Sequence, residues 1–256
     1  MKIIILGSGT STGVPILGCK CKVCLSKDIR DKRSRPGILL VKNGFNLLID
    51  ASQDLREQLL KNGIYRIDGI IITHAHADHI FGLDDTRMLS KKYQKGMDIY
   101  CTKRVEKDIR KVYSYVFDNS QEGGGKPKFS LHNICSLKNI GPFSLKLFDY
   151  YHGGIKLKGF ILDRLVILMD GSYIDMKNYR FIKKYGKIII INSLRTRPHP
   201  THFSIPESIF LVKSLGFEKA YFVHLSDSLK HEDLLKMVPE NIFPTYDGME
   251  IEYEQI

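Results

Sequence analysis

The segment 73–83, THAHADHIFGL, places three histidines and one aspartate within six positions, directly after a short apolar run. Imidazole and carboxylate side chains at this density are typical ligands of divalent metal ions in hydrolases. In an extended backbone His74 and His76 project to the same side, and a turn after them directs Asp78 and His79 toward a second position nearby. The segment therefore predicts a fold that holds metal ions at the end of a buried strand.

The spacing of these ligands favours two ions over one. Imidazole and carboxylate together suit borderline divalent ions, and both zinc and manganese fit that description. A buried cluster of neutral histidines without any metal is the alternative, but it leaves the density of ligands without a reason.

Short apolar runs rich in Ile, Leu and Val recur along the chain and indicate buried strands. They cover residues 2–6, 38–41, 45–49, 69–72, 165–169, 187–191 and 220–223. Segments with helical apolar spacing lie between several of them, at residues 53–61, 104–116, 173–184, 206–214 and 232–237. This alternation predicts a layered α/β architecture.

The composition indicates a globular protein, with 43% hydrophobic and 26% charged residues among 256. Large α/β sandwiches of this length fold as single units, so we expect one domain over residues 1–256. The apolar opening KIIIL is too short for a signal segment, and no apolar run approaches the roughly 20 residues of a membrane-spanning helix. We therefore expect a cytoplasmic protein without membrane contact.

Asp and His residues end the predicted strands in both halves of the chain. In the first half FNLLID ends on Asp50 and GIIITH on His74, and in the second half LVILMD ends on Asp170 and AYFVH on His224. Polar residues just past the strand ends of open α/β sheets face the ligand crevice. The two halves thus resemble weak duplicates that each deliver a carboxylate and an imidazole to a shared edge, although Asp50 has a helix-capping role as its alternative.

The 39 Lys and Arg outnumber the 28 Asp and Glu, which gives a formal charge of +11. This excess favours anionic partners such as phosphate esters or nucleic acid. Ordinary solvated faces are the alternative explanation, because many lysines fall in surface-like runs such as KKYQK. Residues 118–128, DNSQEGGGKPK, predict a flexible loop.

The HxHxDH pattern, the opening LGSGTSTGVP and the strand end LLIDAS resemble the metallo-β-lactamase superfamily along almost the whole chain. The resemblance implies an αβ/βα sandwich, with two mixed β-sheets flanked by helices and the site along one edge of the strands. The implied ligands of one ion are His74, His76 and His152, and those of the other are Asp78, His79 and His224. Asp170 would bridge the ions, and Asp50 would support the ligands.

Three further stretches, GCKCKVC, HADHIFGLDD and TYDGMEI, resemble the branch that contains the phosphoribosyl cyclic phosphodiesterases of phosphonate breakdown. Membership would imply a cyclic or small phosphodiester substrate and a water activated by two ions about 4 Å apart. Asp78 would then take part in catalysis as well as in metal binding. A homodimer is also an expectation at the level of the family.

The segment HPTHFSIPES places His202 just before a predicted helix start, where Ser204 and Glu207 form the S-x-x-E capping pattern. A helix N-terminus favours an anion. The resemblance gives the equivalent histidine the role of proton donor to the leaving oxygen. Nearby loop residues Arg195 and Arg197 are candidate phosphate contacts or ordinary exposed arginines.

Five cysteines are an odd number, and three of them, Cys19, Cys21 and Cys24, form a C-x-C-x-x-C cluster that is unlike a disulfide framework. Thiolates at this spacing can wrap one tetrahedral structural zinc if a fourth ligand comes from elsewhere. In the resembled branch that ligand is a histidine three positions after the last active-site histidine, where this chain has Asp227. Asp227, His231 or an empty site with reduced thiols therefore stay open.

The remaining cysteines, Cys101 and Cys135, are expected in the core.

Two rival functions also remain. One is a nuclease of the same superfamily, such as a ribonuclease Z-like enzyme or an exonuclease, which the positive charge permits. The other is a non-catalytic, metal-bearing binding module, against which the complete set of expected ligands argues.

Overall fold

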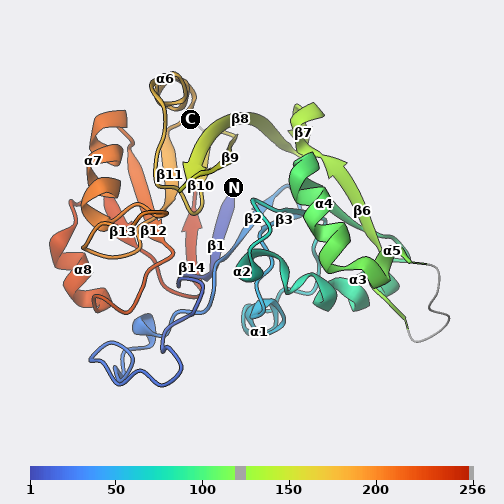
Figure 1. The fold of residues 1–256 in the computed structure, drawn as a ribbon, viewed down its shortest axis with the longest axis horizontal. Helices are drawn as coiled ribbons and strands as arrows, with labels where there is room; N and C mark the ends of the chain where they lie inside the picture. Colours follow the sequence, from blue (N-terminus) through green and yellow to red (C-terminus); the bar gives the residue numbers. More distant parts are fainter. Residues whose placement is uncertain (119–124, 254–256) are drawn as a thin grey trace. The chain divides into compact units, whose positions relative to one another are not determined.

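The computed structural model describes residues 1–118 and 125–253, and the chain divides into two compact units (Figure 1). Unit 1 consists of Met1–Leu6, Gly37–Leu137 and Glu250–Ile256, and unit 2 of Gly7–Pro36 and Lys138–Met249. Each unit joins segments that are distant in sequence and has a sheet and a core of its own. The expectation of a single domain over residues 1–256 stays a prediction.

Unit 1 is built on a mixed sheet. In spatial order its described strands are β14 (Met249–Glu252), β1 (Lys2–Gly7), β2 (Gly37–Lys42), β3 (Phe45–Ile49), β4 (Gly69–Ile71), β5 (Met97–Cys101) and β6 (Phe129–Asn133). β2 and β3 pair antiparallel, whereas β3 to β6 run parallel. The parallel run places the ends of β3 and β4, which carry Asp50 and His74, at the same edge of the sheet.

Helices cover one face of this sheet. They are α1 (Leu55–Lys61), α2 (Ala77–Ile80), α3 (Arg87–Lys92), α4 (Lys103–Val112) and α5 (Ser114–Phe117), with the 3-10 turns η2 (Leu83–Thr86) and η3 (Ile134–Ser136). Their apolar sides form a core with every second strand residue, so that Leu48 and Ile70 of the sheet share a cluster with Val105 and Ile109 of α4. Burial of this face is what fixes the helices on the sheet.

Unit 2 has a second mixed sheet. In spatial order it consists of β13 (Ile242–Pro244), β12 (Lys219–Val223), β11 (Ile188–Asn192), β10 (Leu165–Leu168), β9 (Ile155–Leu162), β8 (Phe143–His152) and β7 (Asn139–Ile140). β10 to β13 run parallel and β7 to β10 antiparallel. The ends of β10 and β12, which precede Asp170 and His224, therefore lie at one edge.

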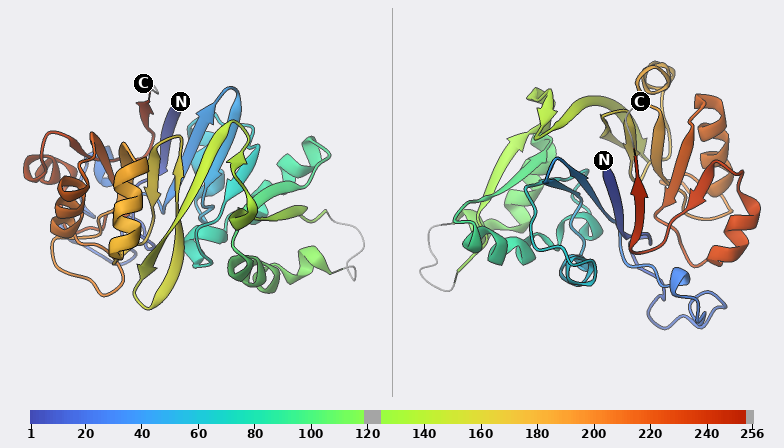
Figure 2. Two further views of the ribbon diagram at one scale, coloured as in Figure 1. Left: turned by 90° about the horizontal axis from the view of Figure 1, so that it is seen from above. Right: turned by 180° about the vertical axis from the view of Figure 1, so that it is seen from behind.

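Three helices pack on the sheet of unit 2, namely α6 (Met176–Tyr185), α7 (Ile205–Leu215) and α8 (His231–Met237), as both views in Figure 2 show. They share a core with alternate strand residues such as Leu168, Ile191 and Phe222. The first segment of unit 2 is a long loop that contains only the 3-10 turn η1 (Ile29–Asp31) as a helical element among its described residues.

The structure confirms the predicted class, two mixed sheets flanked by helices, and all seven predicted strands are present. The predicted helix over residues 104–116 is broken at Tyr113, whose backbone leaves the helical region at φ −105° and ψ 39°. Of the described helices, none combines the length and the apolar composition that a bilayer crossing requires. The predicted loop at 118–128 lies mostly outside the described residues.

Candidate metal centre

Four predicted ligands follow β4 in unit 1 and lie close together. His76 is the N-cap of α2, so the chain turns into the helix directly between His74 and Asp78. His74 Nε2 and His76 Nδ1 are 2.9 Å apart, and His79 Nε2 lies 3.3 Å from Asp78 Oδ2. The ring centroids of His74 and His79 are 4.0 Å apart. The short helix therefore brings together the two ligand pairs that the sequence predicts.

Asp50 and Thr73 orient the imidazoles of this group from below. The buried Asp50 carboxylate accepts the Thr73 backbone N–H at 2.8 Å and lies 2.7 Å from His79 Nδ1. An ionised carboxylate can only accept hydrogen bonds. His79 Nδ1 therefore carries the proton, and His79 Nε2 carries the lone pair. Thr73 Oγ1 donates to Asp50 and lies 3.0 Å from His74 Nδ1. It can therefore accept the Nδ1 proton, which leaves the lone pair of His74 on Nε2.

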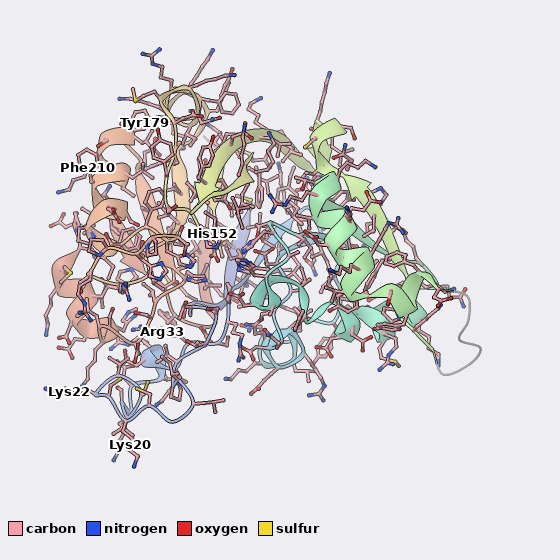
Figure 3. The ribbon with its side chains drawn as sticks, in the orientation of Figure 1. Lys20, Lys22, Arg33, His152, Tyr179 and Phe210 are labelled. Carbon is pink, nitrogen blue, oxygen red and sulfur yellow. The ribbon has the colours of Figure 1, made fainter. Side chains whose placement is uncertain are left out.

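The second group of predicted ligands lies at the strand ends of unit 2. Asp170 Oδ1 is 3.1 Å from His224 Nε2, and both side chains are buried. The ring centroid of His202 lies 4.7 Å from that of His224 and 4.8 Å from that of His152. Residues from β8, from the ends of β10 and β12, and from the loop before α7 thus converge. His152, which Figure 3 labels, is buried.

Backbone groups and one amide side chain hold this second group. His152 Nδ1 donates to the Thr201 carbonyl at 2.8 Å, which leaves the lone pair on Nε2. The buried side chain of Asn192 bridges the backbone of Gly171, accepting its N–H at 2.7 Å and donating to its carbonyl at 3.1 Å. These two hydrogen bonds hold the backbone of Gly171, which is the residue next to Asp170. Asn192 and Thr201 gave no sequence signal, because each is an ordinary polar residue in a strand end or loop.

Three residues of the predicted site have a left-handed backbone, with φ of 60° at Asp50, 54° at Asp170 and 58° at His224. Non-glycine residues rarely adopt this conformation, which costs of order 1–3 kcal/mol and clusters at functional sites. Each of the three follows a parallel strand and turns its side chain at the strand end. The shared conformation is independent support for a common role.

The donor sets of both groups fit divalent metal ions. Each group combines imidazole nitrogens with a carboxylate. In His79 and His152 a hydrogen bond at Nδ1 leaves the lone pair on Nε2. Short distances between nitrogens, such as that from His74 to His76, suit ligands of one cation. Zinc and manganese are both compatible with such donors.

The loop before α7 carries His202 as predicted. α7 begins with the capping box: the Ser204 hydroxyl accepts from Glu207 N at 3.4 Å, and the Glu207 carboxylate accepts from Ser204 N at 2.7 Å. His202 Nδ1 is buried and makes no hydrogen bond to the described part of the chain. Burial and the neighbouring His224 lower the pKa of His202 to about 3, so its imidazole is neutral at pH 7 in the absence of a ligand.

The two loop arginines differ in their surroundings. Arg195 stabilises its own loop, because its guanidinium donates to the carbonyls of Arg197 at 3.3 Å and Pro198 at 3.0 Å. The Arg197 side chain is exposed. The ring of His199 lies 5.1 Å from that of His202, in the same loop. A phosphate contact by either arginine stays a prediction.

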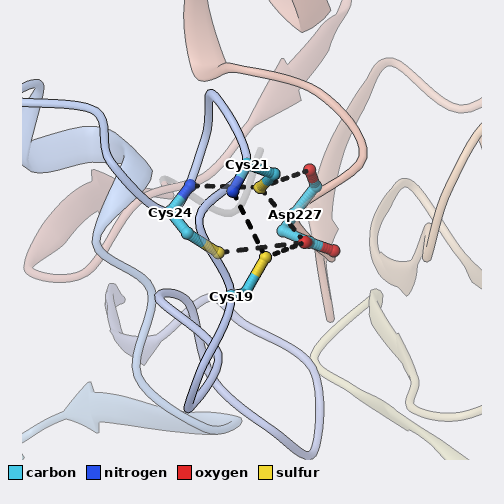
Figure 4. Close-up of side chains that lie close together, drawn as sticks. All are labelled: Cys19, Cys21, Cys24 and Asp227. Atoms are coloured by element: carbon cyan, nitrogen blue, oxygen red, sulfur yellow. Dashed lines mark hydrogen bonds between the residues drawn. The ribbon is translucent and has the colours of Figure 1, made fainter.

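The cysteine cluster forms a compact group within unit 2 (Figure 4). Asp227 Oδ2 lies 3.5 Å from Cys19 Sγ, 3.3 Å from Cys21 Sγ and 3.8 Å from Cys24 Sγ. Backbone N–H groups point at the sulfurs, including that of Cys24 toward Cys21 at 3.4 Å. The Cys24 N–H lowers the pKa of the Cys21 thiol and so favours the thiolate that a metal ion requires, whereas burial raises the pKa of Cys24 to about 12.

Of the two side chains left open as a fourth ligand, the structure places Asp227 with the three cysteines. His231 instead starts α8, where its backbone N–H donates to Asp31 at 2.7 Å and its ring lies beside Tyr246. Cys135 departs from expectation. It is exposed, because Ile134 takes the buried position of the 3-10 turn η3, whereas Cys101 is buried as predicted.

A buried arginine ties the segment that carries Asp227 to the cysteine loop. The Arg33 guanidinium donates to the carbonyls of Ser226 and Leu229, the latter at 2.9 Å, and lies 3.2 Å from the Asp31 carboxylate. Backbone packing at this point is tight, since a Cβ on Gly9 would lie 2.6 Å from the Arg33 carbonyl oxygen. Only glycine fits there, which explains one glycine of the opening motif.

The closing motif meets the opening motif through Asp247. Its carboxylate accepts Ser8 N at 2.8 Å and Ser34 N at 2.7 Å. Ser8 in turn accepts the Leu225 backbone N–H at 2.9 Å, one residue after His224. The two motifs therefore fix the backbone next to a predicted metal ligand.

Replacing Cys21 by Ser should remove one equivalent of bound metal and lower the melting temperature, because the cysteine loop has few apolar contacts and an ion would supply its order. Metal content by elemental analysis and thermal unfolding measure the two effects. Cys135→Ser is the matched control, since that exposed thiol lies outside the group. Wild-type protein with three freely titratable thiols in this loop would contradict a bound ion.

Comparisons with known proteins agree with this geometry. Residues 45–225 match the family model described as "Beta-lactamase superfamily domain". An octanoyltransferase from Porphyromonas gingivalis is 34% identical over 258 residues, which are 98% of this chain and 51% of that protein. The chain therefore spans about half the length of that relative.

Two solved structures are similar over nearly the whole chain. "A New Diphosphatase from the PhnP Family" is 32% identical, with a TM-score of 0.89 over 98% of this chain and 96% of that one. Zn(2+)-bound PqqB from Methylobacterium extorquens is 16% identical, with a TM-score of 0.79 over 99% and 100% of the two chains. The second likeness shows the fold alone.

Proposed function

Because this chain belongs to the β-lactamase superfamily, we propose that it is a metal-dependent phosphodiesterase acting on a cyclic or small phosphodiester. The observation that carries the proposal is the convergence of His152, Asp170, His202 and His224 in unit 2. The Asp170 carboxylate and the imidazoles of the predicted ligands His152 and His224 lie there beside one further imidazole, that of His202, just before a helix start. The similarity to a diphosphatase at 32% identity supports a phosphate-containing substrate.

We assign the ligand groups of both units to two divalent ions. The group of unit 1 offers His74, His76, Asp78 and His79, and the group of unit 2 offers His152, Asp170 and His224. Such ions, when bound, lower the pKa of a water molecule and neutralise charge on a phosphoryl group.

The remaining chemistry belongs to the protein. Asp50 and Thr73 keep the lone pairs of His79 and His74 directed away from the sheet. His202 would hold the proton that the leaving oxygen receives. Since its pKa is low without a ligand, the role requires the anionic substrate beside it to raise that pKa.

Hydrolysis of bis(p-nitrophenyl) phosphate by the purified protein tests the proposal. We expect turnover that chelation abolishes and that zinc or manganese restores. p-Nitrophenyl phosphate serves as the monoester comparison, and labelled single-stranded RNA and DNA test the nuclease alternative. A metal-loaded protein that leaves all phosphodiesters intact would overturn the phosphodiesterase function and favour a binding module.

A further inference from the structure

One surface of unit 2 carries a cluster of basic side chains, and the acidic residue nearest to its helix in sequence is the N-cap, Asp175. We call it the α6 face and define it by Lys177, Arg180, Lys183 and Lys184 of α6 together with Lys146 of β8. All five are exposed, and residues 176–187 contain no Asp or Glu. Most of the chain's excess of Lys and Arg over Asp and Glu also falls in unit 2. The α6 face is therefore a concentrated source of positive potential.

These cations are not neutralised within the described part of the chain, where none of the five forms an ion pair. Some basic residues on other helices are paired with an acidic residue of the same helix. Glu106 of α4 lies 3.4 Å from Lys103 and 3.1 Å from Arg110, and Glu232 of α8 lies 2.5 Å from Lys236. A solvated helix usually carries such pairs. α6 has no Asp or Glu among its ten residues and therefore forms no such pair within the helix.

Aromatic rings alternate with the cations. Tyr185 lies between two of them, with its ring centroid 4.9 Å from Lys146 Nζ and 5.2 Å from Lys184 Nζ, and it contacts Phe181 at 4.8 Å between ring centroids. Tyr179, labelled in Figure 3, lies on the same helix and is half-buried. Tyr173, just before the helix, is 58% exposed.

We propose that the α6 face binds single-stranded nucleic acid. Unpaired lysines and arginines along a helix neutralise successive backbone phosphates, and the exposed ring of Tyr173 provides a stacking surface for a base. A helix of ten residues is about 15 Å long, enough for a few nucleotides. The inference goes beyond the proposed function, because binding along α6 requires no turnover.

The apolar side of α6 argues against an anionic membrane as the partner. Ile182 is buried in the core of unit 2, and Tyr179, Phe181 and Tyr185 pack against that core. Met176 is left as the exposed aliphatic side chain of the helix. A helix that lies in a membrane interface needs a broad apolar face free for insertion, and α6 uses this face within the fold.

The start of the α6 face lies close to a predicted metal ligand along the chain. Tyr173 follows Asp170 by three residues, and its carbonyl accepts the Tyr151 backbone N–H at 2.9 Å, next to His152. A strand bound along α6 would therefore have one end near these two ligands. The surface extends the anion preference of unit 2 beyond the size of a small phosphodiester.

Fluorescence anisotropy with a labelled 12-nucleotide U strand and a T strand tests the proposal on the full chain, with a gel afterwards to confirm that the strand is intact. We expect Kd values of about 1 to 100 µM that rise with salt. The variant K177A/R180A/K183A/K184A should weaken binding by about tenfold or more, and each cation that contacts a phosphate should contribute about 0.7 to the salt slope.

The control K103A/R110A/K236A removes three paired cations and should leave Kd within about twofold. Hydrolysis of bis(p-nitrophenyl) phosphate should not change in the α6 variant, which separates this proposal from the hydrolase function. An equal loss of binding in both variants, or stronger retention on phosphatidylserine vesicles than on either oligonucleotide, would overturn it.

Discussion

Asp170→Asn should reduce phosphodiester hydrolysis by about 10³-fold or more, because Asp170 would help to hold the proposed ions, whose charge stabilisation is worth several kcal/mol. The substitution removes the negative charge that lies 3.1 Å from His224 Nε2 but keeps the shape of the side chain. Asparagine also tolerates the left-handed backbone at this position, where φ is 54° and alanine would add strain. A loss of activity would therefore report on the charge and not on folding.

The chain offers a matched control for this change. Asp163, in the turn between β9 and β10, is another left-handed aspartate of unit 2, with φ of 48°, and its carboxylate accepts Ser144 N at 3.1 Å. Asp163→Asn should retain turnover. Elemental analysis completes the test: the Asp170 variant should bind less metal, whereas full occupancy with normal turnover would remove Asp170 from the site.

The strand-end residues were predictable because their chemistry is unusual for their position. An aspartate or histidine directly after a buried apolar run has few structural reasons to be there, so Asp50, Asp170 and His224 could be identified from sequence. The left-handed backbone that the three share could not, since it depends on how each strand meets the next segment. It became visible only with the structure.

The residues that orient the ligands were not predictable. Thr73 and Asn192 act through hydrogen bonds across strands, to Asp50 and to the Gly171 backbone, and such pairing has no pattern along the chain. The sequence left Asp227 and His231 open for a related reason. Only the fold shows that His231 lies at a helix start and that Asp227 lies beside the cysteines.

Missed strands have a simpler explanation. β8 and β9 form a long hairpin whose sequences, FSLKLFDYYH and IKLKGFIL, mix lysines and an aspartate with apolar residues. Only one face of this hairpin is fully buried, so the apolar run that identifies a central strand is absent. Asp149 pairs there with Lys156 and Lys158, which is a cross-strand arrangement that sequence order does not show.

His202→Ala should slow hydrolysis by roughly 10² to 10⁴, the range for loss of a general acid, while both metals remain bound. His202 is the imidazole of the unit 2 group to which no metal is assigned. Its buried Nδ1 makes no hydrogen bond to the described residues, so no protein group holds a proton there. His199→Ala, which removes a neighbouring ring 5.1 Å away in the same loop, should have a much smaller effect.

A comparison of two leaving groups tests whether His202 donates a proton or only positions the substrate. Burial keeps its pKa at about 3, so the free enzyme has a neutral imidazole at pH 7, and a bound phosphate anion must raise that pKa before a proton can be donated. A p-nitrophenolate leaves without protonation, whereas an alkoxide does not. The loss in the His202 variant should therefore be small for a p-nitrophenyl ester and large for an alkyl ester, and equal losses on both would mean that the ring positions the substrate.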